Sequence, residues 1–272
     1  METADSWIDS VGGRVRVLDI SPENTKNAST QTVLLSCGWS ESIDSVRATA
    51  LELAKIGYRV LAIDYADLDN LKDVPKIADI FPKSESIKSL ALLKVLEVKN
   101  IKEVIALGHS EGAISLLGAT SMSPDLFQKI ILITPAGLIE KENFSRLAYR
   151  FFSNLIFDVF RSLISRHPYA SFAYYRKVFL YFIKNPIQTI REAFGVASVD
   201  ISQIIYDMQK NATLPSIDIV YGKKDRLFPV ELLGAVMEKR GIKNLHLFDG
   251  YHNDIHTKPT SFIPFLENII RS

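Results

Sequence analysis

The chain has 272 residues, of which 47% are hydrophobic, and this is enough to bury the core of one α/β domain with an insertion. Its formal net charge of +1 provides no overall field to attract nucleic acid or anionic lipid, and its single cysteine, Cys37, excludes an internal disulfide. The first six residues are polar and acidic, unlike a secretory leader, and no window of about 18 apolar residues is present to span a membrane. We therefore expect a soluble, cytoplasmic protein.

Short apolar runs alternate with longer amphipathic runs along most of the chain. The short runs predict strands, beginning with an edge strand, at residues 15–18, 32–36, 58–63, 104–107, 129–134, 217–221 and 245–248. The amphipathic runs predict helices at residues 45–56, 87–98, 113–117, 230–240 and 261–270. This alternation predicts an α/β fold with a mostly parallel central sheet of about eight strands, flanked by helices on both faces.

The interval 138–213 interrupts the alternation, and we interpret it as a helical cap, or lid, inserted into a core formed by residues 1–137 and 214–272. It contains no convincing strand, yet 15 of the 27 aromatic residues lie between Phe144 and Tyr206. The aromatic side chains either fill the contact between cap and sheet or line an apolar pocket. Apolar residues recur at helical spacing in two groups, namely Phe152, Leu155, Ile156, Val159, Phe160 and Leu163, and then Phe172, Val178, Phe179, Phe182 and Ile183.

The pentapeptide Gly108-His109-Ser110-Glu111-Gly112 follows one predicted strand directly and precedes a predicted helix. A strand that turns sharply into a helix strains the residue at the turn, and the residues two places away must lack side chains to avoid a collision. This geometry exposes the Ser110 hydroxyl at the carboxyl edge of the sheet and directs the first helical amides towards the group it attacks. The alternative is a surface serine between two glycines. The flanking strand and helix favour a nucleophile.

A nucleophilic serine needs a base and an acid that orients the base, because its hydroxyl is weakly reactive at neutral pH. Asp225 stands in a tight loop just after the predicted strand 217–221, and His252 follows the strand 245–248 in the same way. If these strands are parallel neighbours, both side chains emerge at the sheet edge that carries Ser110. His256 is an alternative base, but it lies where the last helix approaches. The order Ser, Asp, His along the chain is one of the known triad orders.

These motifs resemble those of the α/β-hydrolase superfamily. The pentapeptide around Ser110 resembles its nucleophile elbow, residues 222–229 resemble its acid loop, and Gly250-Tyr251-His252 resembles its histidine loop. The resemblance covers nearly the whole chain, and residues 138–213 match the position of the family's variable lid. It implies a catalytic triad of Ser110, His252 and Asp225 and a two-step acyl transfer. In that scheme His252 removes the proton of Ser110 and returns it to the leaving group, while Asp225 orients the imidazole.

An oxyanion hole needs backbone N–H donors beside the serine. Family members often have a His-Gly pair after the third strand, where this chain has Cys37-Gly38-Trp39-Ser40. We expect the amides of Trp39 and Glu111 to form the hole, and Gly38 and Ser40 remain alternatives to Trp39. The side chains that we expect to contact substrate are those of Trp39, His109, Phe228 and Tyr251.

The sequence thus predicts a serine hydrolase that cleaves carboxylic esters or thioesters with an apolar acyl or alcohol part. Two alternatives stay open: an acyltransferase that uses the same triad, and a non-catalytic receptor for apolar ligands on the same fold. The expected partner is a small apolar ester. We expect no metal and no cofactor, because no histidine–carboxylate set shows ligand spacing and no glycine pair has phosphate-loop context. Basic residues alternate with the cap's aromatic residues, which is typical of a solvated face or of transient contact with a membrane surface.

Overall fold

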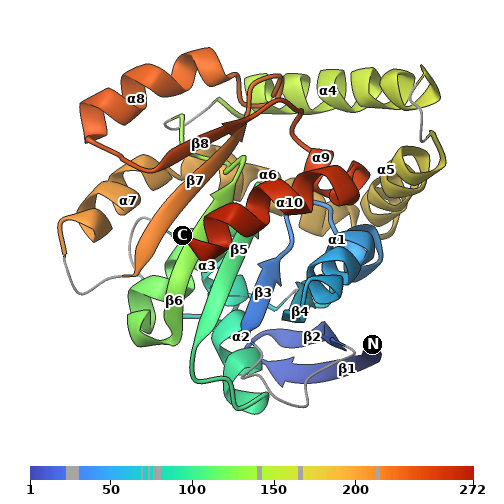
Figure 1. Cartoon of the computed structure of the whole chain (residues 1–272). Helices are drawn as coiled ribbons and strands as arrows, with labels where there is room; N and C mark the ends of the chain where they lie inside the picture. Colours follow the sequence, from blue (N-terminus) through green and yellow to red (C-terminus); the bar gives the residue numbers. More distant parts are fainter. Residues whose placement is uncertain are drawn as a thin grey trace.

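The computed structural model describes residues 1–22, 31–68, 70–72, 74–75, 77, 81–139, 143–164, 168–211 and 215–272. Within this part, the side chains of residues 162–171 are not described, and the predicted apolar position Leu163 is among them. One twisted sheet of eight strands forms the centre of the molecule (Figure 1). The strand order is β1-β2-β4-β3-β5-β6-β7-β8.

The first two strands form an antiparallel hairpin, and β2 also pairs antiparallel with β4. The other neighbouring pairs in the sheet are parallel. The predicted α/β fold with a mostly parallel sheet of eight strands is therefore confirmed. The bounds of the strands are β1 (Glu2–Ser10), β2 (Gly13–Ser21), β3 (Thr32–Ser36), β4 (Arg59–Asp64), β5 (Val104–His109), β6 (Phe127–Ile133), β7 (Ser216–Gly222) and β8 (Leu245–Phe248).

The edge of the sheet differs from the sequence prediction. The strand predicted at 15–18 lies within β2, which has a partner on each side, and the edge strand is β1. The alternation in β1 is hard to recognise, because Ile8 is its only buried residue and most of its other side chains are exposed. An edge strand with one solvent-facing side has no need of the apolar pattern that marks a buried strand.

Helices cover both faces of the sheet. One face packs against α1 (Ile43–Lys55), α9 (Asp254–Thr257) and α10 (Pro259–Arg271), and the other against α2 (Lys83–Val98), α3 (Gly112–Met122) and α8 (Leu233–Arg240). Figure 1 shows α1 and α10 on the near side of the sheet and α2 and α3 behind it. Short 3₁₀ turns cover Pro124–Leu126 and Val230–Leu232, so the helix predicted at 230–240 begins as such a turn.

Four helices are inserted between β6 and β7, namely α4 (Phe144–Ile164), α5 (Pro168–Lys184), α6 (Pro186–Ser198) and α7 (Ile201–Gln209). We call α4, α5 and α6 the cap, since they pack against one another, whereas α7 joins the core with Ile201 and Ile205. The insertion occupies the interval where the sequence predicts a lid. None of the described helices is both long and apolar enough to cross a lipid bilayer.

Candidate active site

Ser110 stands at the turn between β5 and α3, at the carboxyl edge of the sheet. Its φ of +51° lies in the left-handed region, which residues with a side chain rarely adopt. The two flanking glycines leave no space for a methyl group. A Cβ on Gly108 would lie 2.8 Å from Ala113 Cα, and one on Gly112 would lie 2.3 Å from the carbonyl oxygen of Ser36. The turn therefore has the strain and the close packing that the pentapeptide predicts for a nucleophile elbow.

A chain of hydrogen bonds connects Ser110 to His252 and Asp225. Nε2 of His252 lies 3.1 Å from Ser110 Oγ, and Nδ1 of His252 lies 2.8 Å from Asp225 Oδ2. The other oxygen of Asp225 accepts the N–H groups of Leu227 and Phe228 at 2.8 and 2.9 Å. The carboxylate is thus fixed by its own loop, and Nδ1–H of His252 donates to it, which leaves Nε2 free to accept the Ser110 proton. All three side chains are buried.

His256, the alternative base, does not reach Ser110. Its ring is buried in α9, where Nδ1 lies 2.8 Å from Thr49 Oγ1 and Nε2 lies 3.2 Å from Glu41 Oε1. The hydroxyl of Thr49 donates to the carbonyl of Ile255, so that hydroxyl accepts the Nδ1–H of His256. Geometry therefore selects His252 as the histidine beside the serine.

The loop that follows β3 passes directly beneath the elbow. A Cβ on Gly38 would lie 3.0 Å from the carbonyl oxygen of His109 and 3.1 Å from Ser110 Cβ. The N–H of Gly38 donates to the Glu41 carboxylate at 2.6 Å. Of the amides that the sequence left open as oxyanion donors, Gly38 is therefore engaged with Glu41, and Trp39 and Ser40 remain.

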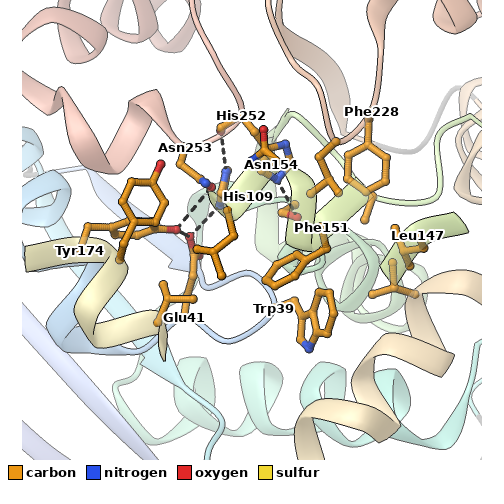
Figure 2. Close-up of a pocket in the computed structure, with 17 residues that line it drawn as sticks. Trp39, Glu41, His109, Leu147, Phe151, Asn154, Tyr174, Phe228, His252 and Asn253 are labelled. Carbon is orange, nitrogen blue, oxygen red and sulfur yellow. Dashed lines mark hydrogen bonds and ion pairs between the residues drawn. The ribbon is translucent and has the colours of Figure 1, made fainter. Parts of the chain in front are cut away.

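Glu41 is a buried carboxylate at the centre of a polar cluster that the sequence analysis missed. Oε2 accepts the Gly38 N–H, and Oε1 accepts the Tyr174 hydroxyl of α5 at 2.7 Å. Oε1 also lies 3.0 Å from His109 Nδ1 and 3.2 Å from His256 Nε2. The cluster therefore joins the β3 loop, the elbow, the region after His252 and the cap (Figure 2).

Charge interactions shift the pKa values in this cluster. Burial by itself raises the pKa of Glu41, but the adjacent His256 and His109 outweigh it and hold that pKa well below its ordinary range. Burial lowers the pKa of His109, yet Glu41 raises it above its ordinary value overall. Nε2 of His109 also lies 3.1 Å from the carbonyl oxygen of His252, and because that oxygen can only accept a hydrogen bond, Nε2–H is the donor. The His109 ring therefore lies between the Glu41 carboxylate and the backbone carbonyl of His252, and it links the β3 loop to the histidine loop.

The sequence shows no spacing typical of metal ligands, but the fold brings Glu41, His109 and His256 together. Their ligand atoms lie within 4.8 Å of one another. The three residues come from separate segments, so no local motif could have indicated the set. We assign no ion to it, because Oε1 of Glu41 already accepts the Tyr174 hydroxyl and faces both imidazoles.

A second buried cluster lies on the other side of the elbow. Nζ of Lys88 in α2 is 2.8 Å from Glu111 Oε1 and 2.8 Å from Glu192 Oε1 of α6, and Glu85 lies beside them. Burial raises the pKa of Glu111 to about 8 and that of Glu192 to about 6, because a single ammonium group serves three carboxyl groups. The side chain of Glu111 is therefore protonated at neutral pH, and the cluster connects the elbow to the cap.

A narrow pocket with a cavity volume of about 40 Å³ lies between the cap and the sheet edge that carries Ser110. Figure 2 shows its two sides: Trp39, Phe151, Leu147 and Phe228 on one, and Glu41, His109, Tyr174 and Asn253 on the other. Of the cap, α4 contributes Leu147, Phe151, Asn154 and Leu155, α5 contributes Tyr174, Tyr175 and Val178, and α6 contributes Val196.

Three of the four side chains predicted to contact substrate line this pocket: Trp39, His109 and Phe228. The structure does not bring Tyr251 there. Its ring packs instead against α4, with the guanidinium of Arg161 3.9 Å above it and the Phe157 ring 5.8 Å away. Trp39 has an additional contact, because its indole N–H donates to the carbonyl of Thr189 at 3.0 Å and so joins the β3 loop to α6.

The cap aromatic residues divide between the pocket and the outer surface. Phe151, Tyr174 and Tyr175 line the pocket. Phe152 and Phe160, with Ile156 between them, are exposed although they lie on the same predicted apolar face as Leu155. The sequence alternatives, core filling and pocket lining, therefore account for only part of the apolar surface of the cap.

A family model described as serine aminopeptidase, S33, matches residues 27–259 of the chain. The chain belongs to this family. The resemblance to the α/β-hydrolases that the motifs around Ser110, Asp225 and His252 carry is thereby confirmed, and this S33 family member is a hydrolytic enzyme by membership. No curated protein sequence matches it.

Solved structures share the fold of this S33 family member at low sequence identity. An esterase from Exiguobacterium antarcticum is 17% identical with a TM-score of 0.72, and the match covers 99% of this chain and 100% of that one. The esterase RhEst1 from Rhodococcus sp. ECU1013 is 15% identical with a TM-score of 0.69, covering 100% and 99%. A bromoperoxidase from Bacillus anthracis is 15% identical with a TM-score of 0.70, covering 99% and 100%.

Proposed function

We propose that the protein is a serine hydrolase that cleaves carboxylic esters or thioesters with an apolar acyl or alcohol part. The observation that carries this proposal is the hydrogen-bonded chain from Ser110 through His252 to Asp225 at the wall of the pocket. The similar solved structures include two esterases and a thioesterase domain, which supports the ester class.

In the proposed mechanism, Ser110 Oγ attacks the carbonyl carbon of the ester while Nε2 of His252 takes the hydroxyl proton. The carbonyl oxygen becomes an oxyanion, which the amides of Trp39 and Glu111 stabilise. His252 then returns the proton to the leaving alcohol or thiol, and an acyl-Ser110 intermediate remains. In the second step, His252 takes a proton from a water molecule, the water attacks the acyl-Ser110 carbonyl, and the acid is released. Asp225 stabilises the imidazolium of His252 in both steps.

The pocket supports an apolar substrate. Leu147, Phe151 and Val178 surround the space beside Ser110, and Trp39 packs on Phe151 at 4.2 Å between ring centroids. The carboxylate in the wall, Glu41, is already paired with His109 and Tyr174, so it offers little to a cationic substrate. We propose that acyl or alcohol chains occupy the side formed by α4, Trp39 and Phe228.

Two alternatives use the same pocket. An acyltransferase would pass the acyl group of Ser110 to an acceptor other than water, and a receptor would bind an apolar ligand without chemistry. The alignment of His252 between Ser110 and Asp225 favours catalysis over a receptor, because a receptor needs no such proton path. We also propose a cytoplasmic location, supported by the single cysteine, Cys37, which is buried and unpaired.

The test is turnover of nitrophenyl esters of increasing acyl length by the wild-type protein and by Ser110→Ala, with an aminoacyl nitroanilide in parallel. We expect ester turnover in the wild type alone, and covalent labelling of Ser110 by a fluorophosphonate. Loss of Ser110 from a working triad lowers kcat on the order of a million-fold, and adding His252→Ala lowers it little further. Equal turnover by wild type and Ser110→Ala would refute the proposal, and preference for the nitroanilide would refute the ester class.

A further inference from the structure

The outer surface of the cap is apolar along all three helices. Eleven of the seventeen large apolar side chains that are exposed in the described part of the chain belong to α4, α5 and α6. On α4 they form a continuous stripe of Tyr149, Phe152, Ile156 and Phe160, exposed by 74%, 53%, 58% and 64%. On α5 and α6 the exposed residues are Phe172, Phe179, Leu180 and Ile183, and then Ile187, Ile190 and Phe194. Exposed apolar surface on this scale marks an interaction site.

Each helix exposes these residues on the face opposite to the one it buries. At about 100° per residue, Ile156 points away from Leu147 and Phe151, which line the pocket, and Phe152 points away from Leu147. The helices also contact one another through aromatic rings, since Phe144 of α4 stacks on Phe194 of α6 at 4.2 Å and Phe152 lies 6.4 Å from Phe182 of α5. We call the exposed apolar residues of α4, α5 and α6 the outer cap face.

Charge on the cap is almost entirely positive. Residues 143–199 contain eight basic residues against two acidic ones, so this segment carries +6 and the rest of the chain carries −5. The two acidic residues, Asp158 and Glu192, are both buried. Arg146, Arg176 and Lys184 are exposed on the same helices as the outer cap face. Among the described residues of the cap, the exposed charges that accompany the outer cap face are therefore basic, which the near-zero net charge of the whole chain does not reveal.

We propose that the outer cap face docks on an anionic lipid bilayer and that the substrate is an ester held in that bilayer. A bilayer surface complements both properties at once, because apolar side chains enter the boundary between headgroups and acyl chains while cations bind anionic headgroups. No exposed carboxylate of the cap opposes that approach. The inference concerns the source of the substrate and rests on the proposed ester hydrolysis at Ser110.

Docking in this orientation places the pocket one helix layer from the lipid. The helix α4 would contact the bilayer with Phe152 and Ile156 and line the pocket with Phe151 and Leu155. An ester whose acyl chain lies in the bilayer then has a short apolar route to Ser110. A water-soluble ester reaches Ser110 without docking. Comparing hydrolysis of a soluble ester with hydrolysis of an ester held in a bilayer therefore distinguishes docking from catalysis.

The experiment measures co-sedimentation of the full chain with two kinds of vesicle, phosphatidylcholine alone and an equal mixture of phosphatidylcholine and phosphatidylglycerol. We expect binding to the mixed vesicles that weakens as ionic strength rises, because salt screens exposed charges. Replacing Phe152, Ile156 and Phe160 by serine lowers the partition coefficient by about tenfold for each residue that enters the lipid. Arg176→Gln and Lys184→Gln each lower it about fivefold.

The matched controls are Val98→Ser and Leu232→Ser, which remove exposed apolar side chains of the core and leave the partition coefficient unchanged. In activity assays the outer-face variants lose hydrolysis of a diacylglycerol held in the mixed vesicles but retain hydrolysis of nitrophenyl acetate. If the wild type hydrolyses nitrophenyl acetate and does not sediment with vesicles, the docking inference is wrong and the proposed function stands. If it sediments but hydrolyses neither ester, the proposed function fails. Docking would also be wrong if the wild type forms a stable dimer and the triple serine variant is a monomer, because a second copy of the chain would then cover the outer cap face.

Discussion

Two buried glutamates, Glu41 and Glu192, have opposite pKa shifts, and we expect only the amide variant of Glu41 to lose stability. Glu41 has a pKa well below its ordinary value of 4.5, because His256 and His109 outweigh the effect of burial. Glu41→Gln keeps the shape of the side chain but removes the negative charge of the carboxylate that faces the His109 ring. Removing one charge of a buried ion pair costs about 3–5 kcal/mol. We expect the melting temperature to fall by about 10 °C.

The pH dependence of the unfolding free energy tests whether the loss comes from the charge interaction between Glu41 and His109. Because the folded pKa of Glu41 is lowered, its contribution is present above about pH 4.5 and is lost as the pH falls through the folded value. Because the folded pKa of His109 is raised, its contribution is complete below about pH 6.5 and is lost as the pH rises through the folded value. The difference in unfolding free energy between wild type and Glu41→Gln is therefore largest between these two pH values.

Glu192→Gln is the matched control, since Glu192 is equally buried but faces the Lys88 cluster. Burial raises its pKa to about 6, so its ionised form destabilises the fold by about 2 kcal/mol at pH 8. The amide should leave stability at pH 8 unchanged or increase it. Urea unfolding of both variants across the pH range measures the two effects. Equal losses in the two variants, without pH dependence, would refute the electrostatic reasoning.

Three further outcomes are expected. Asp225→Asn should lower kcat about ten-thousand-fold if the carboxylate orients His252, while the melting temperature shows whether the fold persists; a loss below tenfold would contradict that role. Gly112→Ala should destabilise the protein by about 3 kcal/mol or more in urea unfolding, because the new Cβ meets the Ser36 carbonyl at 2.3 Å. Its control, Gly234→Ala in α8, meets no atom within 4 Å and should stabilise by up to about 1 kcal/mol. Burial raises the pKa of Asp64 to about 6, so the unfolding free energy should fall by up to about 3 kcal/mol as the pH rises from about 4 to 6, and Asp64→Asn should abolish that slope.

The local sequence determined the parts of this protein that depend on short stretches of chain. Short apolar runs predicted β3 and β8 with their observed bounds, and β3 is buried along its whole length, as a strand covered on both faces requires. The sequence also predicted the nucleophile elbow, because glycine is the only residue type that fits at positions 108 and 112 on either side of Ser110. Asp225 and His252 could be named because parallel strands end at one edge of a sheet.

Only the tertiary structure decided which groups meet across long sequence separations. Glu41, His109, His256 and Tyr174 come from four segments, and nothing in their spacing indicates that they share one buried site. The direction in which Tyr251 points depends on its packing against Arg161 of the cap, which its place in the histidine loop does not reveal. The periodicity of α4 predicted an apolar helix but not its two apolar faces, because which face is buried depends on the neighbours the fold supplies.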